Sequence, residues 1–93
     1  MKITYHHDAG HGWLEVPLAT AMLVKTPLKQ ISGYSYVGLK GGFTPTLYLE
    51  EDCDAGVFLD AAAACGKKVE FIHQHHGDEC FVRQLADYPA GGI

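Results

Sequence analysis

The chain has 93 residues, of which 47% are hydrophobic and 19% are charged, and its formal net charge is −4. This length suits a single domain over residues 1–93, and the acidic balance argues against direct binding to nucleic acid, whose phosphates are neutralised by clustered Lys and Arg. No apolar run reaches the roughly 20 residues of a membrane-spanning helix, so we expect no membrane partner.

The N-terminal part predicts a strand hairpin followed by a helix. Polar and apolar residues alternate over residues 2–7, and residues 13–16 resume an extended pattern after a glycine-containing turn. Pro17 suits the first position of a helix, which we expect to continue to Lys25 and to end before Thr26-Pro27. One further turn is expected at residues 28–31.

A second hairpin and the clearest helix are predicted in the middle of the chain. Residues 34–39 and 46–50 read as strands, joined by Gly41-Gly42 and a loop extension over residues 43–45. Asp52 or Asp54 would then cap a helix that ends at Gly66. The apolar stripe of this helix consists of Val57, Phe58, Ala61, Ala62 and Cys65.

The C-terminal part predicts a strand over residues 68–73 and a third helix that starts at Asp78. Phe81, Val82, Leu85 and Tyr88 recur at helical spacing before Pro89. Strands and helices in this order indicate an α+β fold, a small mixed or antiparallel sheet with two to three helices packed on one face.

Three cysteines, Cys53, Cys65 and Cys80, form an odd set without the CxxC spacing, and no cleavable hydrophobic segment precedes the first polar residues. This usage favours reduced thiols and a cytoplasmic location.

Six histidines fall into two groups, near residues 6–11 and residues 73–76. Because neutral imidazole is a good zinc ligand, the candidate metal ligands are His7, His11, His73, His75 and Cys80. The spacing matches no zinc motif that we can name. The alternative interpretation is a set of exposed or hydrogen-bonded histidines at strand ends.

A small enzyme would use His11 or Cys80 as its reactive group. The sequence has no GxSxG, HExxH, P-loop or dinucleotide-binding motif. The segment Gly10-His11-Gly12 also has the composition of a turn that needs positive φ. We therefore assign no catalytic residue.

Four carboxylates gather where the predicted strand meets the central helix, at Glu50, Glu51, Asp52 and Asp54. They are interpreted either as helix caps with solvated neighbours or as an acidic patch that docks a basic partner. Trp13, Tyr34 and Tyr36 are candidate interface anchors, with core burial as the alternative.

Three segments together resemble small accessory proteins of bacterial phages and plasmids, namely residues 10–17 (GHGWLEVP), 31–36 (ISGYSY) and 48–54 (YLEEDCD). The resemblance carries no catalytic motif, and the histidines of residues 73–76 lie outside it. It implies an inhibitor of host defence, such as an anti-CRISPR or anti-restriction protein, that acts by binding in the bacterial cytoplasm.

The resulting hypothesis is a non-enzymatic binding protein. Its acidic surface would dock on the nucleic-acid-binding site of a host protein or ribonucleoprotein, without a cofactor. A zinc-binding protein and a small Cys/His enzyme are the alternatives, and free sheet edges would suit a homodimer.

Overall fold

The computed structural model describes residues 1–93. Its strands are β1 (Lys2–His7), β2 (Gly12–Pro17), β3 (Tyr36–Lys40), β4 (Thr44–Glu50), β5 (Glu70–His75) and β6 (Ala86–Asp87). Its α-helices are α1 (Leu18–Leu23) and α2 (Ala55–Ala64), and two short 3₁₀ turns are η1 (Leu28–Gln30) and η2 (Phe81–Gln84). None of the helices has the length and apolar character needed to cross a bilayer.

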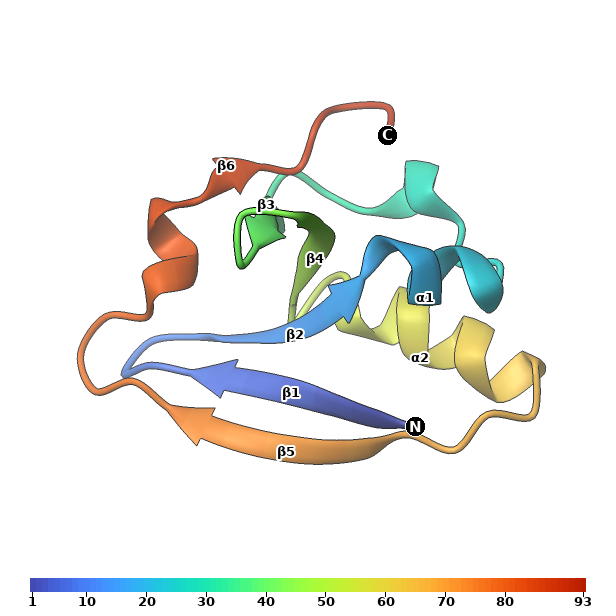
Figure 1. Ribbon diagram of the computed structural model, residues 1–93, viewed down its shortest axis with the longest axis horizontal. Helices are drawn as coiled ribbons and strands as arrows, with labels where there is room; N and C mark the ends of the chain where they lie inside the picture. The colour runs from blue at the N-terminus through green and yellow to red at the C-terminus, as the bar shows by residue number, and fades with distance from the viewer.

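All six strands join one mixed sheet in the order β5-β1-β2-β4-β3-β6 (Figure 1). Neighbouring strands are antiparallel except β1 and β5, which are parallel. Helix α2 connects β4 to β5, because strands that run in the same direction need a crossover rather than a tight turn. The predicted α+β class and both predicted hairpins are confirmed.

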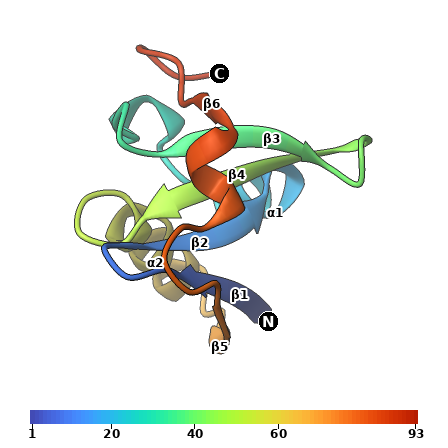
Figure 2. The ribbon, with the colours of Figure 1, turned by 90° about the vertical axis from the view of Figure 1, so that its left-hand side faces the viewer.

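Side-chain alternation gives the sheet two different faces. The register of β1 and β2 places Tyr5 beside Leu14 and His6 beside Trp13. We call the first side the helix face, because α1 and α2 pack on it. We call the second the η2 face, because the chain after β5 returns across it. Figure 2 shows η2 in front of the sheet, with the helices behind and β6 at the sheet edge.

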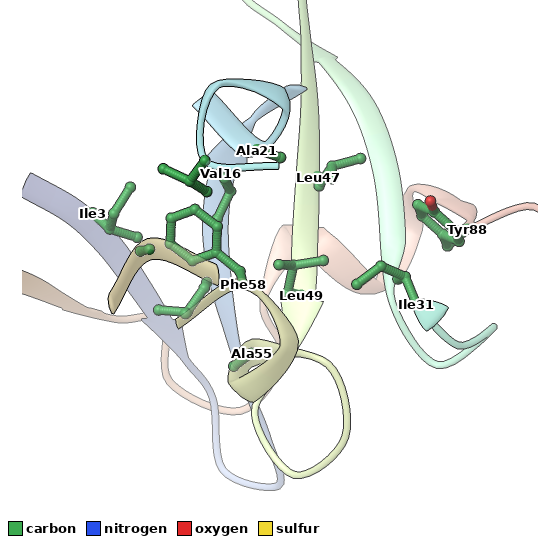
Figure 3. Packing of buried hydrophobic residues seen from close by; sticks show 12 residues of the cluster. Ile3, Val16, Ala21, Ile31, Leu47, Leu49, Ala55, Phe58 and Tyr88 are labelled. Carbon is green, nitrogen blue, oxygen red and sulfur yellow. The ribbon is translucent and has the colours of Figure 1, made fainter. Parts of the chain in front are cut away.

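The main hydrophobic core lies on the helix face. Phe58 of α2 is fully buried and lies among Ile3, Val16 and Leu49 of the sheet (Figure 3). Ala55 and Ala62 on the same side of α2 are also buried. Their small side chains let the helix backbone approach the strands closely.

A smaller cluster on the η2 face consists of Trp13, Tyr48, Cys80 and Val82, with Tyr36 and Leu85 packed against it. Two of the four buried residues come from the central strands and two from the returning segment. This cluster therefore holds the C-terminal part of the chain on the sheet.

The third predicted helix is wrong. Residues 81–84 form only a 3₁₀ turn, and Ala86–Asp87 pair with β3 as a strand on the edge of the sheet. The helical spacing of apolar residues is overridden because the Cys80 N–H and the Arg83 guanidinium both bind Asp8. Val82 and Leu85 then pack onto the η2 face, opposite the two α-helices.

Smaller differences concern where the elements begin and end. Thr44 and Pro45, expected in a loop, belong to β4. Helix α1 ends at Leu23, ahead of Lys25, which has a φ of 59° that a right-handed helix does not accommodate. Gly66 follows α2 with a φ of 71°, as predicted for a helix-ending glycine.

Asp54 stands at the N-cap of α2, but its side chain does not bind the N–H groups of that helix. Its buried carboxylate accepts hydrogen bonds from the Ser32 N–H at 3.0 Å, from Ser32 Oγ at 2.7 Å and from Ser35 Oγ. Asp54 therefore fixes the loop before β3 against the start of α2.

Replacing Asp54 with Ala should lower the free energy of unfolding by about 3 kcal/mol, because it leaves the half-buried donors of Ser32 and the buried hydroxyl of Ser35 without an acceptor. Urea unfolding followed by circular dichroism measures the change. Asp60→Ala on the exposed side of α2 is the matched control and should change stability little. Equal unfolding midpoints for the two variants would contradict this role of Asp54.

Candidate functional site

Five of the predicted binding residues meet at one end of the η2 face. Trp13, Tyr34, Tyr36, Glu50 and Asp52 line a pocket of about 260 Å³, which we call the aromatic–acidic pocket. The remaining lining residues are His11, Cys53 and Arg83. Seven of these eight residues come from the three segments on which the sequence resemblance rests.

Strand pairing explains why these residues meet. Antiparallel pairing of β2 with β4 sets Trp13, near the start of one strand, opposite Glu50 at the end of the other. Pairing of β3 with β4 sets Tyr36 beside Tyr48 on the same face. The loop that carries Tyr34 is held by the hydrogen bond from the Ser32 N–H to the Asp54 carboxylate.

The Asp8 carboxylate fixes the positions of two lining residues, His11 and Arg83. It accepts hydrogen bonds from the backbone N–H groups of Gly10 at 2.9 Å and His11 at 3.0 Å, which shapes the turn between β1 and β2. It also accepts from the Cys80 N–H at 2.9 Å and from Arg83 Nε at 2.6 Å and Nη2 at 3.0 Å. The Asp8 side chain is fully buried, and the hydrogen bonds from Arg83, aided by those from the backbone, outweigh burial and hold its pKa far below the usual range.

Arg83 lies against the aromatic wall of the pocket. Its guanidinium carbon is 5.1 Å from the centre of the Trp13 ring, within the range of a cation–π contact. Because Asp8 already neutralises this guanidinium, Arg83 adds little net positive charge to the pocket. The Trp13 indole is 2% exposed, and its Nε1 has no hydrogen-bond partner.

Glu50 and Asp52 make the pocket acidic. Glu50 Oε2 accepts from the N–H groups of Asp52 at 3.0 Å and Cys53 at 2.9 Å, while its Oε1 lies 3.6 Å from His11 Nδ1. Donor atoms of His11, Glu50 and Asp52 all lie within 4.8 Å of one another. No lysine lines the pocket, so two carboxylates face a space that has no unpaired basic side chain.

The other two residues of the predicted acidic patch do not line the pocket, and each has an internal partner. Glu51 is half-buried and accepts a hydrogen bond from the Tyr5 hydroxyl at 3.0 Å. Asp54 is buried and bound by two serines, as described above. The structure therefore does not present Glu50, Glu51, Asp52 and Asp54 as one exposed surface, and only Glu50 and Asp52 reach the pocket.

All three cysteines are free thiols. Neither Cys53, which lines the pocket, nor Cys80, which lies beside the histidines, is poised as a thiolate. The hydrogen bond to Glu50 raises the pKa of Cys53, and burial raises the pKa of Cys80. Reactive cysteines depend on a lowered pKa, so these two lack the main feature of an activated nucleophile.

The parallel pairing of β1 with β5 brings the two histidine groups together. His7 is opposite His75 and bonds to His73, with His7 Nε2 and His73 Nδ1 2.8 Å apart on the helix face, where β5 is exposed. On the η2 face, His6 Nδ1 lies 2.8 Å from His76 Nε2.

The metal-ligand candidates predicted from the sequence are thus divided among three places. His7, His73 and His75 stay together, His11 lies in the aromatic–acidic pocket, and Cys80 joins His6 and His76. The sequence placed His6 and His76 in the two histidine groups without predicting that they meet, because only the register between β1 and β5 reveals this.

Comparisons of this chain with models of protein families, with curated proteins and with solved structures gave no significant match.

Replacing Asp8 with Asn should lower the free energy of unfolding at pH 7 by about 3 kcal/mol, because it leaves the Arg83 charge without its buried partner. The folded-state pKa of Asp8 is depressed, so its stabilisation is complete above the unfolded-state pKa of about 3.9 and declines as the pH falls below that value. Urea unfolding at pH 7 and pH 3 measures both effects.

Asp78→Asn is the matched control, since Asp78 is exposed. The stability gap between wild type and Asp8→Asn should narrow at pH 3. A gap that is absent at pH 7, or equally large at pH 3, would contradict the role given to Asp8.

Proposed function

We propose that this protein acts by binding, and that the aromatic–acidic pocket receives a cationic side chain from a partner. The observation that supports this proposal best is the presence of two carboxylates, Glu50 and Asp52, in a pocket with aromatic walls and no lysine.

Aromatic rings and carboxylates favour cations for different reasons. The faces of Trp and Tyr attract a positive charge through the ring quadrupole, and the carboxylates attract it directly and accept its hydrogen bonds. The contact between Arg83 and Trp13 is an example of this preference within the protein itself. Tyr34 is 72% exposed and so provides an aromatic surface that a partner can cover.

The size of the pocket suits one side chain rather than a large ligand. Pockets for drug-sized molecules usually measure about 300–1,000 Å³, and this one is about 260 Å³. We infer that it takes the ammonium group and alkyl stem of a lysine that projects from a basic protein surface.

Such a partner agrees with the charge of the chain, −4, which would speed its encounter with a basic surface. The resemblance to phage and plasmid proteins implies that the partner belongs to a host defence complex, such as a CRISPR effector or a nuclease. The nucleic-acid-binding surfaces of these complexes are rich in Lys and Arg, and the protein would inhibit by covering them.

The fluorescence of Trp13, the only tryptophan of the chain, can report on the pocket. Titration with n-butylammonium, a minimal lysine side chain, should change it in a saturable way that weakens as salt is added. Tyr34→Ala and Asp52→Asn should each weaken binding about two- to fivefold, through a lost cation–π contact and a lost charge respectively.

Two controls accompany this titration. Neutral n-butanol has the same alkyl stem without the charge, and Asp60→Asn removes an exposed carboxylate that does not line the pocket. The proposal fails if n-butanol gives the same response as n-butylammonium, or if Asp60→Asn weakens binding as much as Asp52→Asn.

A further inference from the structure

Two imidazoles and a thiol converge on the η2 face, outside the aromatic–acidic pocket. His6 Nδ1 and His76 Nε2 are 2.8 Å apart, and one ring nitrogen of each histidine lies within 4.8 Å of Cys80 Sγ. His6 is 3% exposed and Cys80 is 1% exposed, while His76 is half-buried and leaves a route from solvent.

Glu15 orients the His6 ring from its other side. The His6 Nε2–H donates to Glu15 Oε1 at 2.9 Å, and Glu15 Oε2 accepts from Lys40 Nζ at 2.6 Å. A carboxylate paired with lysine only accepts hydrogen bonds, so His6 must hold its proton on Nε2. The Nδ1 lone pair therefore points at His76, in the carboxylate–histidine arrangement that is typical of metal sites.

The surroundings hold the other two groups in place. The Cys80 backbone N–H is bound to Asp8, which sets the position of the thiol. The Phe81 ring stands edge-on to His6, with centroids 5.1 Å apart, and to His76, with centroids 5.6 Å apart. Phe81 thus forms an apolar wall beside both imidazoles.

We infer that His6 Nδ1, His76 Nε2 and Cys80 Sγ form a binding site for Zn²⁺, with a fourth position open to water. A Cys/His/His set matches the ligand preference of zinc, which binds nitrogen at about 2.0–2.1 Å and sulfur at about 2.3 Å in tetrahedral geometry. Tetrahedral ligation needs the two nitrogens roughly 3.3 Å apart. The rings and the thiol therefore move on the order of 1 Å or less to close on the ion.

Zinc binding rearranges the protons at the site. In the free protein, the His76 Nε2–H donates to His6 Nδ1, since His6 keeps its own hydrogen on Nε2. To bind zinc, His76 moves its proton to Nδ1 through solvent, and the Cys80 thiol releases its proton to water. The bound ion then joins β1 to the segment after β5, which are about 70 residues apart in sequence.

The exposed cluster of His7, His73 and His75 is the weaker candidate. It contains no thiol, no carboxylate orients its rings, and its strand β5 is exposed along its whole length. It provides the natural comparison for mutagenesis.

The test is a titration of untagged protein with Co²⁺, whose thiolate charge-transfer and tetrahedral d–d bands report the ligand set. The wild type should bind one Co²⁺ with both bands, and Zn²⁺ should displace it. Cys80→Ser should abolish the charge-transfer band, whereas Cys65→Ser, at an exposed thiol, should retain it. Glu15→Gln should weaken binding about 10- to 100-fold through loss of the orienting carboxylate.

A second measurement guards against variants that simply misfold. Zn²⁺ should raise the thermal midpoint of the wild type and of His75→Ala but not that of His76→Ala, with circular dichroism confirming that each variant is folded. The inference is overturned if folded Cys80→Ser keeps the charge-transfer band. It is also overturned if metal binding is lost in His75→Ala but kept in His76→Ala, which would assign the metal to the exposed cluster.

Discussion

The buried carboxylate of Asp8 is the contact on which the η2 face depends. It binds the turn between β1 and β2 through two backbone N–H groups, and it binds the returning segment through Cys80 and Arg83. A single side chain thus joins two parts of the chain that are more than 70 residues apart. The buried cluster of Trp13, Tyr48, Cys80 and Val82 then completes the attachment of η2 to the sheet.

The two proposed sites lie on opposite sides of the Asp8 carboxylate. Toward the aromatic–acidic pocket, Asp8 sets the backbone of His11 and holds Arg83 over Trp13. Toward the histidines, it holds the backbone of Cys80 beside His6. The pocket and the proposed zinc site therefore both depend on Asp8. They use different side chains, so the side chains of one site can be mutated without changing those of the other.

The two faces of the sheet bury different kinds of residues. The helix face contains most of the buried aliphatic residues and provides the core, with Phe58 at its centre. The η2 face instead buries Trp13, Tyr48, His6 and Glu15, which are polar or amphipathic groups with specific hydrogen-bond needs. Such groups contribute less to stability than an aliphatic core.

Local sequence patterns predicted most of the fold because its hairpins and α2 depend on neighbouring residues. Alternation predicted β1 and β2, and Gly66 predicted the end of α2. The third helix was mispredicted because the spacing of Phe81, Val82 and Leu85 fits a helix, and the competing bond to Asp8 is distant in sequence.

The candidate site was predicted in part for the same reason. Aromatic and acidic residue types singled out Trp13, Tyr34 and Glu50, but their meeting in a pocket depends on the β2–β4 register. Asp54 was grouped with them because the sequence does not show that Ser32 and Ser35 bind it. The pairing of His6 with His76 depends on the parallel pairing of β1 with β5, two strands that are far apart in the sequence.

The most direct test of the role of Asp8 is amide hydrogen exchange of the unmodified protein by NMR. The account predicts that the N–H groups of Gly10, His11 and Cys80, all outside helices and strands, exchange on the order of 100-fold or more slower than unstructured amides. Exchange of Cys80 as fast as that of its exposed neighbour Glu79 would contradict it.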